Sequence, residues 1–302
     1  MAAKWQSIVD DSPCSPSPLG GPEYSATMNI AWGKTFILEC DDLFVPFFKS
    51  TTTNFKILKS DSYQGLRFNS LPGYERIDAD ILKSLPAKCA LQLDLPEELF
   101  QPAREELARH CFHEQGNYLY YKVHLPPSYE DWFMQKGMDR SNVRKAENAG
   151  LTVVIGGVEM LEDFYRMFLC SFERWQKDDR AKEPHPIERF RRMFEMQSSH
   201  AKIANAIYEG KVISSVIFCH YKNTAGAFNS GTDFEYQKLR SSDYAFSEII
   251  RYLISQGVKE FHLGGTLGGK NLSQFKRKLG ATEHKSHIVT RHRFPRLRNM
   301  LK

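Results

Sequence analysis

The chain has 302 residues, of which 41% are hydrophobic and 25% are charged, and its formal net charge is +5. This length suits two domains of about 150 residues, and the composition is that of a globular protein with enough apolar mass for a core. No run approaches the roughly 18 consecutive apolar residues that span a membrane, and the N-terminal segment has acidic residues where a secretion signal needs an apolar run. We therefore expect a cytoplasmic protein.

The first half of the chain is expected to contain strands and one clear helix. Residues 11–25 are rich in Ser, Pro and Gly and indicate an irregular loop. Apolar runs predict strands over 34–48 and 55–69. A helix is expected over 96–112, where acidic residues come early and basic residues late, as the helix dipole favours. An aromatic strand follows at Tyr118–Val123.

The second half alternates helices and strands. Helices are predicted within 128–150 (two pieces) and over 161–175, 187–196, 243–256 and 271–279, and strands over 151–155, 201–208, 212–221, 225–231, 260–263 and 287–294. The helix at 243–256 is the clearest, because an apolar stripe runs from Phe246 to Ile254 and either Ser242 or Asp243 can cap its start. This order predicts an α/β fold around a central mixed sheet.

Cysteine spacing argues against a disulfide framework or a metal site. The six cysteines lie far apart without a CxxC pair, which is typical of free, buried thiols. Residues 110–114 (His-Cys-Phe-His-Glu) include metal-binding types, but no second ligand pair follows at a spacing suited to zinc. We expect no metal ion.

Positive charge is concentrated at the C-terminal end. From Lys270 to Lys302 there are ten basic residues and one acid, Glu283, which gives +9, whereas the rest of the chain has 31 basic and 35 acidic residues, which gives −4. Such a basic segment favours an anionic partner such as nucleic acid or a nucleotide, and a solvated, solubilising tail is the alternative.

Four segments carry a family resemblance: Glu209-Gly210-Lys211 between two strands, AFNSGTDFEY at 227–236, FHLGG at 261–265 and QFKRKLGA at 274–281. Together they resemble the Fem-type branch of the GNAT acyltransferase superfamily, which includes the aminoacyltransferases that build peptidoglycan cross-bridges. The segment 140–151 is similar to the basic helix that opens the family's second domain.

The resemblance implies two GNAT-like domains, each with a central mixed sheet flanked by helices. The N-terminal domain would span 1–127, with 284–302 as a candidate to complete it, and the C-terminal acyltransferase domain would span 128–283. The resemblance covers roughly the second of these and is thin before it.

It also implies catalytic roles for Phe275 and Lys276. Amide formation passes through a tetrahedral oxyanion, which a fixed cation stabilises. The lysine of the family's F-K pair is the candidate for that task, and the carbonyl of Phe275 would lie near the attacking amine. The alternative is that Phe275 is ordinary core and Lys276 is one of three adjacent surface charges.

Donor-binding residues are expected at a strand end and at a helix start. Gly264 and Gly265 leave the backbone open to a ligand. Arg240, Ser242 and Asp243 stand where ordinary GNAT enzymes carry the glycine-rich loop that holds the coenzyme A pyrophosphate, and the glycines are missing here.

Three further residues complete the predicted donor site. Tyr236 is a candidate pocket hydroxyl, and Arg291 and Arg293 are candidate contacts in the basic C-terminal segment.

These features predict an acyltransferase that moves an aminoacyl group from aminoacyl-tRNA to an amine on a small molecule or peptide. Two alternatives stay open. One is an N-acyltransferase that uses acyl-CoA or an acyl carrier protein, and the other is a catalytically inactive GNAT-like protein that binds RNA. The donor would be a co-substrate, and no tightly bound cofactor is expected.

Overall fold

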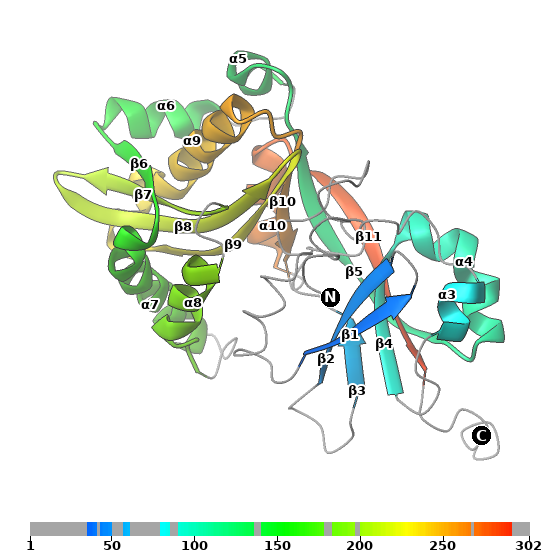
Figure 1. Ribbon diagram of the computed structural model, residues 1–302. Helices are drawn as coiled ribbons and strands as arrows, with labels where there is room; N and C mark the ends of the chain where they lie inside the picture. The colour runs from blue at the N-terminus through cyan, green and yellow to red at the C-terminus, as the bar shows by residue number, and fades with distance from the viewer. Residues whose placement is uncertain are drawn as a thin grey trace. The chain divides into compact units, whose positions relative to one another are not determined.

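The computed structural model describes residues 35–40, 43–49, 57–60, 79–84, 90–135, 140–177, 183–196, 200–266 and 269–291. The chain divides into two compact units, Met1–Tyr120 with Glu283–Lys302, and Tyr121–Thr282 (Figure 1). Among the described helices, none has the length and apolar character that crossing a membrane requires. The boundaries predicted for two GNAT-like domains stay a prediction.

The first unit contains a mixed sheet with the strand order β1-β2-β3-β4-β11-β5. Its elements are β1 (Thr35–Cys40), β2 (Leu43–Lys49), β3 (Ile57–Ser60), α3 (Ala79–Ser84), β4 (Ala90–Pro96), α4 (Glu97–Arg109), the first part of β5 (His113–His124) and β11 (Thr282–Arg291). Strands β3 and β4 are parallel, and the β1/β2, β2/β3 and β4/β11 pairs are antiparallel.

The strands predicted for the first unit are described in part. Within the segment 34–48, β1 and β2 form an antiparallel pair in which Cys40 faces Leu43, and Asp41-Asp42 is the polar break in the apolar run at that point. The strand predicted over 55–69 is described only at 57–60, and the remainder lies outside the described residues. The helix predicted over 96–112 is confirmed as α4.

The second unit is built on strands in the order β5-β10-β9-β8-β7-β6. These are the last part of β5, β6 (Thr152–Gly156), β7 (Ala201–Tyr208), β8 (Lys211–Tyr221), β9 (Thr224–Thr232) and β10 (Glu260–Gly265). Successive strands from β6 to β9 pair antiparallel, whereas β10 runs parallel to β9. The α/β class with a mixed sheet is therefore confirmed.

Helices cover both faces of this sheet (Figure 1). They are α5 (Tyr129–Phe133), α6 (Arg140–Asn148), α7 (Leu161–Lys177), α8 (Ile187–Met196), α9 (Ser241–Ser255) and α10 (Lys270–Lys278), with short 3-10 turns η2 (Val158–Met160) and η3 (Phe234–Leu239). Helices α6 and α9 lie on one face and α7 and α8 on the other. The apolar stripe of α9 is confirmed, since Ile249, Ile250 and Leu253 are fully buried.

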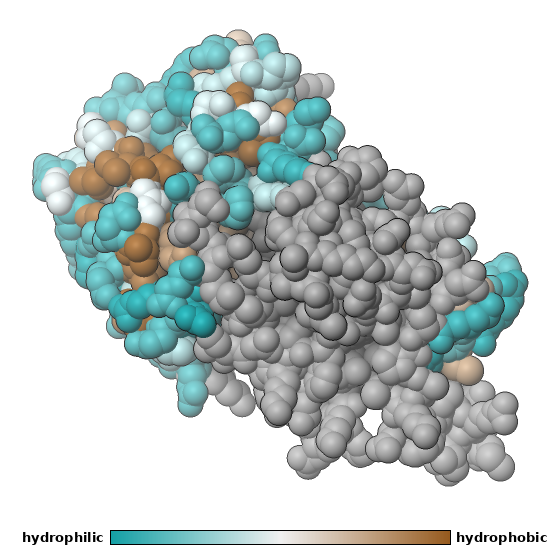
Figure 2. Space-filling view, in the orientation of Figure 1, coloured by the Kyte–Doolittle hydropathy of each residue, from teal (hydrophilic) through white to brown (hydrophobic). Residues whose placement is uncertain are grey.

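The described surface in Figure 2 is largely hydrophilic, with smaller hydrophobic areas over the second unit. Exposed apolar side chains there include Val154 of edge strand β6 and Val158 of η2, each 49% exposed. Such scattered exposure is ordinary for a protein surface.

A bulge in β9 sets the direction of its side chains. Ile217 of β8 faces Asn229, but the next residue, Phe218, faces Ala227, so Phe228 is the extra residue. A bulge bends its strand and re-aims the side chains beside it. This local change lies just where β9 runs beyond its pairing with β10.

Candidate active site

The parallel strands β9 and β10 are hydrogen bonded only at their beginnings. Their register joins Glu260 to Thr224, Phe261 to Ala225 and His262 to Gly226. Beyond these pairs β9 continues to Thr232 and β10 to Gly265 without further pairing between the two. The strands predicted over 225–231 and 260–263 are therefore neighbours in the sheet, and they part on the carboxyl side of His262.

Lys276 lies at the carboxyl end of β10. Its Nζ donates hydrogen bonds to the carbonyl oxygens of Gly264 at 2.9 Å and Gly265 at 2.7 Å, and the residue is only 5% exposed. Gly264 has φ +71°, a left-handed conformation that favours glycine. The structure thus brings three predicted site residues together, and Lys276 is not a surface charge.

Burial dominates the electrostatics of Lys276. Desolvation lowers its pKa to about 8, which leaves the ammonium form in the majority at pH 7. Nζ also lies 5.7 Å from the ring centroid of Tyr121. Within the described ranges, no carboxylate lies at ion-pair distance from it. An ammonium group has three N–H donors, and two of them are committed to carbonyls.

Phe275 and the end of α10 are fixed by core packing. The Phe275 ring is edge-to-face with Phe246 of α9, with centroids 5.4 Å apart. Beyond the helix, the Leu279 carbonyl accepts a hydrogen bond from Nε1 of the fully buried Trp132 at 3.1 Å. The side chain of Phe275 therefore packs in the core, and this contact orients the helix that carries Lys276.

The start of α9 differs from the prediction. Neither Ser242 nor Asp243 caps the helix, because its N-cap is Arg240 in a left-handed conformation with φ 60°. The 3-10 turn η3 ends directly before it, and the helix begins at Ser241. Ser242 Oγ instead lies 2.7 Å from Thr232 Oγ1 on β9.

Asp243 is enclosed by its neighbours. Its Oδ1 accepts a hydrogen bond from Asn142 Nδ2 of α6 at 3.0 Å. Burial raises the pKa of Asp243, against the lowering effects of that hydrogen bond and of the Arg240 charge. The Ser241 hydroxyl, at the first residue of α9, is buried and has no hydrogen-bond partner among the described residues.

The remaining predicted residues do not join Lys276 in its hydrogen-bond network. Tyr236 in η3 contacts Lys211, whose Nζ lies 4.6 Å from the Tyr236 ring centroid. Arg291 belongs to the first unit, where it is 8% exposed and stacks over Phe112 at 5.1 Å. Arg293 lies outside the described residues.

Sequence reasoning missed the polar partners of the predicted residues. Asn142 reaches Asp243 across 101 positions, and Thr232 and Ser214 surround the Ser242 hydroxyl. No spacing in the sequence signals these contacts, because they depend on how α6 and β8 pack near α9. Among the described residues no His, Cys, Asp and Glu cluster is arranged to hold a metal ion.

In this mixed sheet the parallel strands β9 and β10 part beyond a bulge, and the buried Lys276 of α10 bonds to the carboxyl end of β10. The family model described as "Acetyltransferase (GNAT) domain" matches residues 135–286, and the chain belongs to this family. No curated protein matches the sequence.

Solved structures agree with this assignment. The chain is similar to FemX, with a TM-score of 0.71, 11% identity and 95% of each chain covered. It is also similar to the C-terminal domain of a putative lysylphosphatidylglycerol synthetase from Agrobacterium fabrum, with a TM-score of 0.61, 11% identity and coverage of 96% of this chain and 92% of that one. The structure of L-PGS from Bacillus licheniformis gives a TM-score of 0.59 at 11% identity, over 97% of this chain and 92% of that one.

Membership in the GNAT family is therefore confirmed together with a fold like that of FemX, and the protein is an acyltransferase. Membership in the family implies an acyl-donating co-substrate of the acyl-CoA type and an amine acceptor.

Proposed function

We propose that this protein transfers an aminoacyl group from aminoacyl-tRNA to an amine, with Lys276 stabilising the tetrahedral intermediate. The observation that carries the proposal is a buried ammonium group held at the end of β10 by two neutral carbonyls. Its positive charge is fixed in place but is not cancelled by a carboxylate among the described residues, so it is available to a developing oxyanion.

The reaction can be written with all bonds accounted for. The neutral acceptor amine attacks the ester carbonyl carbon of the donor, and the carbonyl π electrons move to the oxygen. The third N–H of Lys276 donates to that oxyanion. Collapse re-forms the carbonyl and breaks the bond to the tRNA ribose oxygen. That oxygen takes up the proton which the amine nitrogen loses, and the products are an amide and a free ribose hydroxyl.

The start of α9 supports tRNA over coenzyme A as the carrier of the acyl group. A helix N-terminus attracts anions through its free amides and its dipole. Here Asp243 already places a carboxylate in the first turn of α9, and Arg240 stands directly before the helix in place of a glycine. The Asp243 carboxylate offsets part of the attraction that the helix start and the Arg240 charge would exert on a coenzyme A diphosphate. The four sequence segments that resemble Fem-type enzymes also favour aminoacyl-tRNA as the donor.

Acyl-CoA is the second candidate, and one observation favours it. The buried Ser241 hydroxyl at the first residue of α9 has no partner among the described residues and could donate to a phosphate. The family's usual co-substrate is also of this type.

The two donors can be compared directly. Total tRNA charged with radiolabelled amino acids and a pool of acyl-CoA thioesters are each incubated with the protein and a mixture of amines. We expect label to leave tRNA for the amines, and binding to weaken steeply with salt because phosphate contacts release counterions. Release of coenzyme A thiol without loss of label from tRNA would contradict the proposal and support the second candidate.

Deacylated tRNA and the Lys276→Met variant are the controls for this comparison. Deacylated tRNA measures binding without transfer. The variant should bind charged tRNA with unchanged affinity, because Lys276 acts mainly in the transition state.

A further inference from the structure

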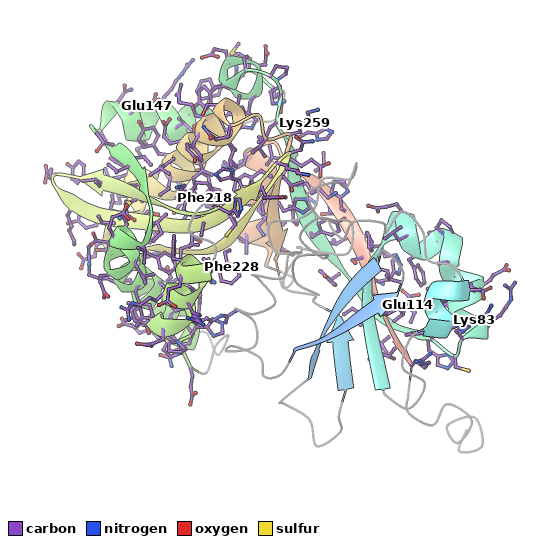
Figure 3. The ribbon with its side chains drawn as sticks, viewed as in Figure 1. Lys83, Glu114, Glu147, Phe218, Phe228 and Lys259 are labelled. Atoms are coloured by element: carbon purple, nitrogen blue, oxygen red, sulfur yellow. The ribbon has the colours of Figure 1, made fainter. Side chains whose placement is uncertain are left out.

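A second buried cation lies on the face of β9 that is turned away from α9. Helix α8 places the guanidinium carbon of Arg189 5.6 Å from the ring centroid of Phe228. Arg189 is 5% exposed and Phe228 is 7% exposed. Phe190, the next residue on α8, packs edge-to-face on the same ring, with centroids 6.5 Å apart. Figure 3 shows Phe228 on the α8 side of the sheet and Phe218 further toward α9.

The bulge turns Asn229 toward the same face as Phe228. Neighbouring residues of a strand point to opposite faces, and paired residues share one. Phe218 packs in the core with Phe246 and Ile249 of α9, so its neighbour Ile217 and the residue paired with it, Asn229, face the other way.

The position of Gly231 supports this orientation. Gly231 follows Asn229 by two residues, and a Cβ atom at Gly231 would lie 2.2 Å from backbone atoms of Met167 in α7. Asn229 thus faces the layer formed by α7 and α8. Its Nδ2 is buried and has no hydrogen-bond partner among the described residues.

The chemistry of this cluster matches a carboxylate. A guanidinium group only donates hydrogen bonds, in a planar fork that fits two carboxylate oxygens, and an amide NH₂ adds a further donor. His185, beside α8, does not add a second charge, because burial and the nearby Arg189 charge lower its pKa to about 4 and it is neutral at pH 7. The apolar rings of Phe228 and Phe190 exclude water and strengthen such a contact.

The cluster and the Lys276 contact begin equally far along their two strands. His262 pairs with Gly226, and two residues beyond this last pair lie Gly264 on β10 and Phe228, the bulged residue, on β9. The Gly264 carbonyl accepts a hydrogen bond from Lys276, and the guanidinium of Arg189 lies over the ring of Phe228. Lys276 and Arg189 thus each contact one of the two strands just beyond the point where β9 and β10 part.

We propose that Arg189 and Asn229 bind a carboxylate of the acceptor, so that the acceptor is an amino acid or a short peptide with a free carboxylate near its reacting amine. This inference rests on the proposed function, since it names the acceptor class for the same site. The carboxylate would hold the acceptor on the α8 side while its amine reaches the donor carbonyl beside Lys276.

Ligand-observed NMR with two matched pools tests this inference. One pool holds the L-amino acids and a set of dipeptides, and the other holds the same compounds as C-terminal carboxamides. We expect members of the first pool to bind the full-length protein and their carboxamides to bind at least about tenfold more weakly, as for a desolvated charged contact. Arg189→Gln should abolish this preference, and Asn229→Leu should reduce it.

Arg192→Gln is the matched control. Arg192 lies on the same helix with 48% of its side chain exposed and pairs with Glu195, so its loss should leave binding unchanged. Should Arg189→Gln fail to fold, Arg189→Lys and Asn229→Leu give the same test. The inference is overturned if neither pool binds, if acids and carboxamides bind equally, or if the preference survives in the Arg189 and Asn229 variants.

Transfer assays then separate this inference from the proposed function. Aminoacyl transfer that is equally fast to acids and to carboxamides would overturn the carboxylate site and leave the proposed function standing. Selective binding of acids without any aminoacyl transfer would overturn the proposed function and leave the carboxylate site standing.

Discussion

Each of the two units buries a basic side chain, and the two are compensated in opposite ways. In the first unit, His287 is 2% exposed and has Glu114 Oε1 at 2.7 Å from Nδ1 and Glu97 Oε2 at 2.7 Å from Nε2. Its ring also stacks on Phe100, with centroids 4.0 Å apart. In the second unit, Lys276 is 5% exposed and contacts neutral carbonyls.

The partners decide what each cation can do. Ionised carboxylates only accept hydrogen bonds, and one lies against each ring nitrogen of His287. Positive charge on this ring is therefore compensated by Glu97 and Glu114, and the contact serves stability. Two carbonyls hold the Lys276 charge in place without cancelling it, and such a group suits stabilisation of an anion. The acceptors around a buried cation, rather than its burial, therefore separate a structural role from a catalytic one.

The largest expected effect is the loss of turnover when the positive charge of Lys276 is removed. Lys276→Met keeps the length and apolar stem of the side chain but deletes the charge. If Lys276 faces the oxyanion, kcat should fall by about 10²–10³, or ~3–4 kcal/mol, with little change in donor affinity. Turnover, donor binding and melting temperature are measured together.

Lys278→Met is the control for this change, because Lys278 lies on the same helix and is exposed. Equal and small losses of turnover in the two variants would show that Lys276 has only a structural role, in which it donates hydrogen bonds to the carbonyls at the end of β10.

Replacing His287 should affect stability instead of turnover. His287→Leu removes the hydrogen bonds between the ring and the two carboxylates, so we expect the free energy of unfolding to fall by about 1–3 kcal/mol, measured by denaturant titration. Turnover per folded molecule should stay the same. A loss of kcat comparable to that of Lys276→Met would show that His287 also acts in turnover.

The pH dependence of this stability follows from Glu97. Hydrogen bonds from His287, and then Gln101, lower the pKa of Glu97 below its ordinary value. The contribution is therefore present above the pKa of an unfolded glutamate and is lost as the pH falls through the folded pKa. Lys285→Met, which removes a more exposed partner of Glu97 at 3.6 Å, should lower the free energy of unfolding by less than His287→Leu does.

A smaller effect on kcat is expected when only the pH is changed, because Lys276 can lose its proton. The pKa of Lys276 is about 8 because of burial, so the ammonium form is lost as the pH rises through that value. If the ammonium stabilises the oxyanion, kcat should fall about tenfold for each pH unit well above 8. Lys276→Arg should move this decline to higher pH, since arginine stays protonated. Activity that rises through pH 8 would instead indicate that the neutral amine acts as a base.

The smallest expected effect concerns Asp243, which is partly buried in the first turn of α9. Asp243→Asn removes negative charge from the first turn of α9, and we expect affinity for coenzyme A thioesters to increase by ~0.3–1 kcal/mol while tRNA binding changes little. Asp163→Asn, in the first turn of α7, is the control. An equal increase in both variants would mean that overall charge, rather than this helix start, governs the binding of coenzyme A.

Much of the second unit could be predicted because its signals are local. Strand β7 and helix α8 have the predicted bounds of 201–208 and 187–196, and α9 begins two residues before its predicted start. An apolar stripe with helical spacing and two strands around Glu209-Gly210 are encoded within a few residues. These elements are therefore visible without any knowledge of packing.

The first unit was less predictable, although one signal was present. Strand β4 at Ala90–Pro96 was missed, yet Leu91, Leu93 and Leu95 alternate as a strand requires, and Leu93 and Leu95 are buried. Helix α3 has only six residues, too few for a clear stripe. Short elements depend on the neighbours that bury them.

The C-terminal basic segment shows what charge counting leaves out. Lys276 and Arg291 both belong to it, and both are more than nine-tenths buried, in different units. A run of basic residues gives a net charge but does not say which side chains reach solvent. The reading of this whole segment as a solvated tail was therefore wrong for these two residues.

Local sequence patterns predict the α/β class and most helices and strands of the second unit, and the Fem-type resemblance rests in part on the F-K pair at 275–276. Three contacts depend instead on tertiary packing: Lys276 Nζ bonds to the carbonyls at the end of β10, Asn142 meets Asp243, and the bulge at Phe228 turns Asn229 toward α8. Helices and turns follow from interactions within a few residues. The pKa of a side chain and its partners follow instead from burial and from contacts between distant segments, which form only when the sheet and its helices pack together.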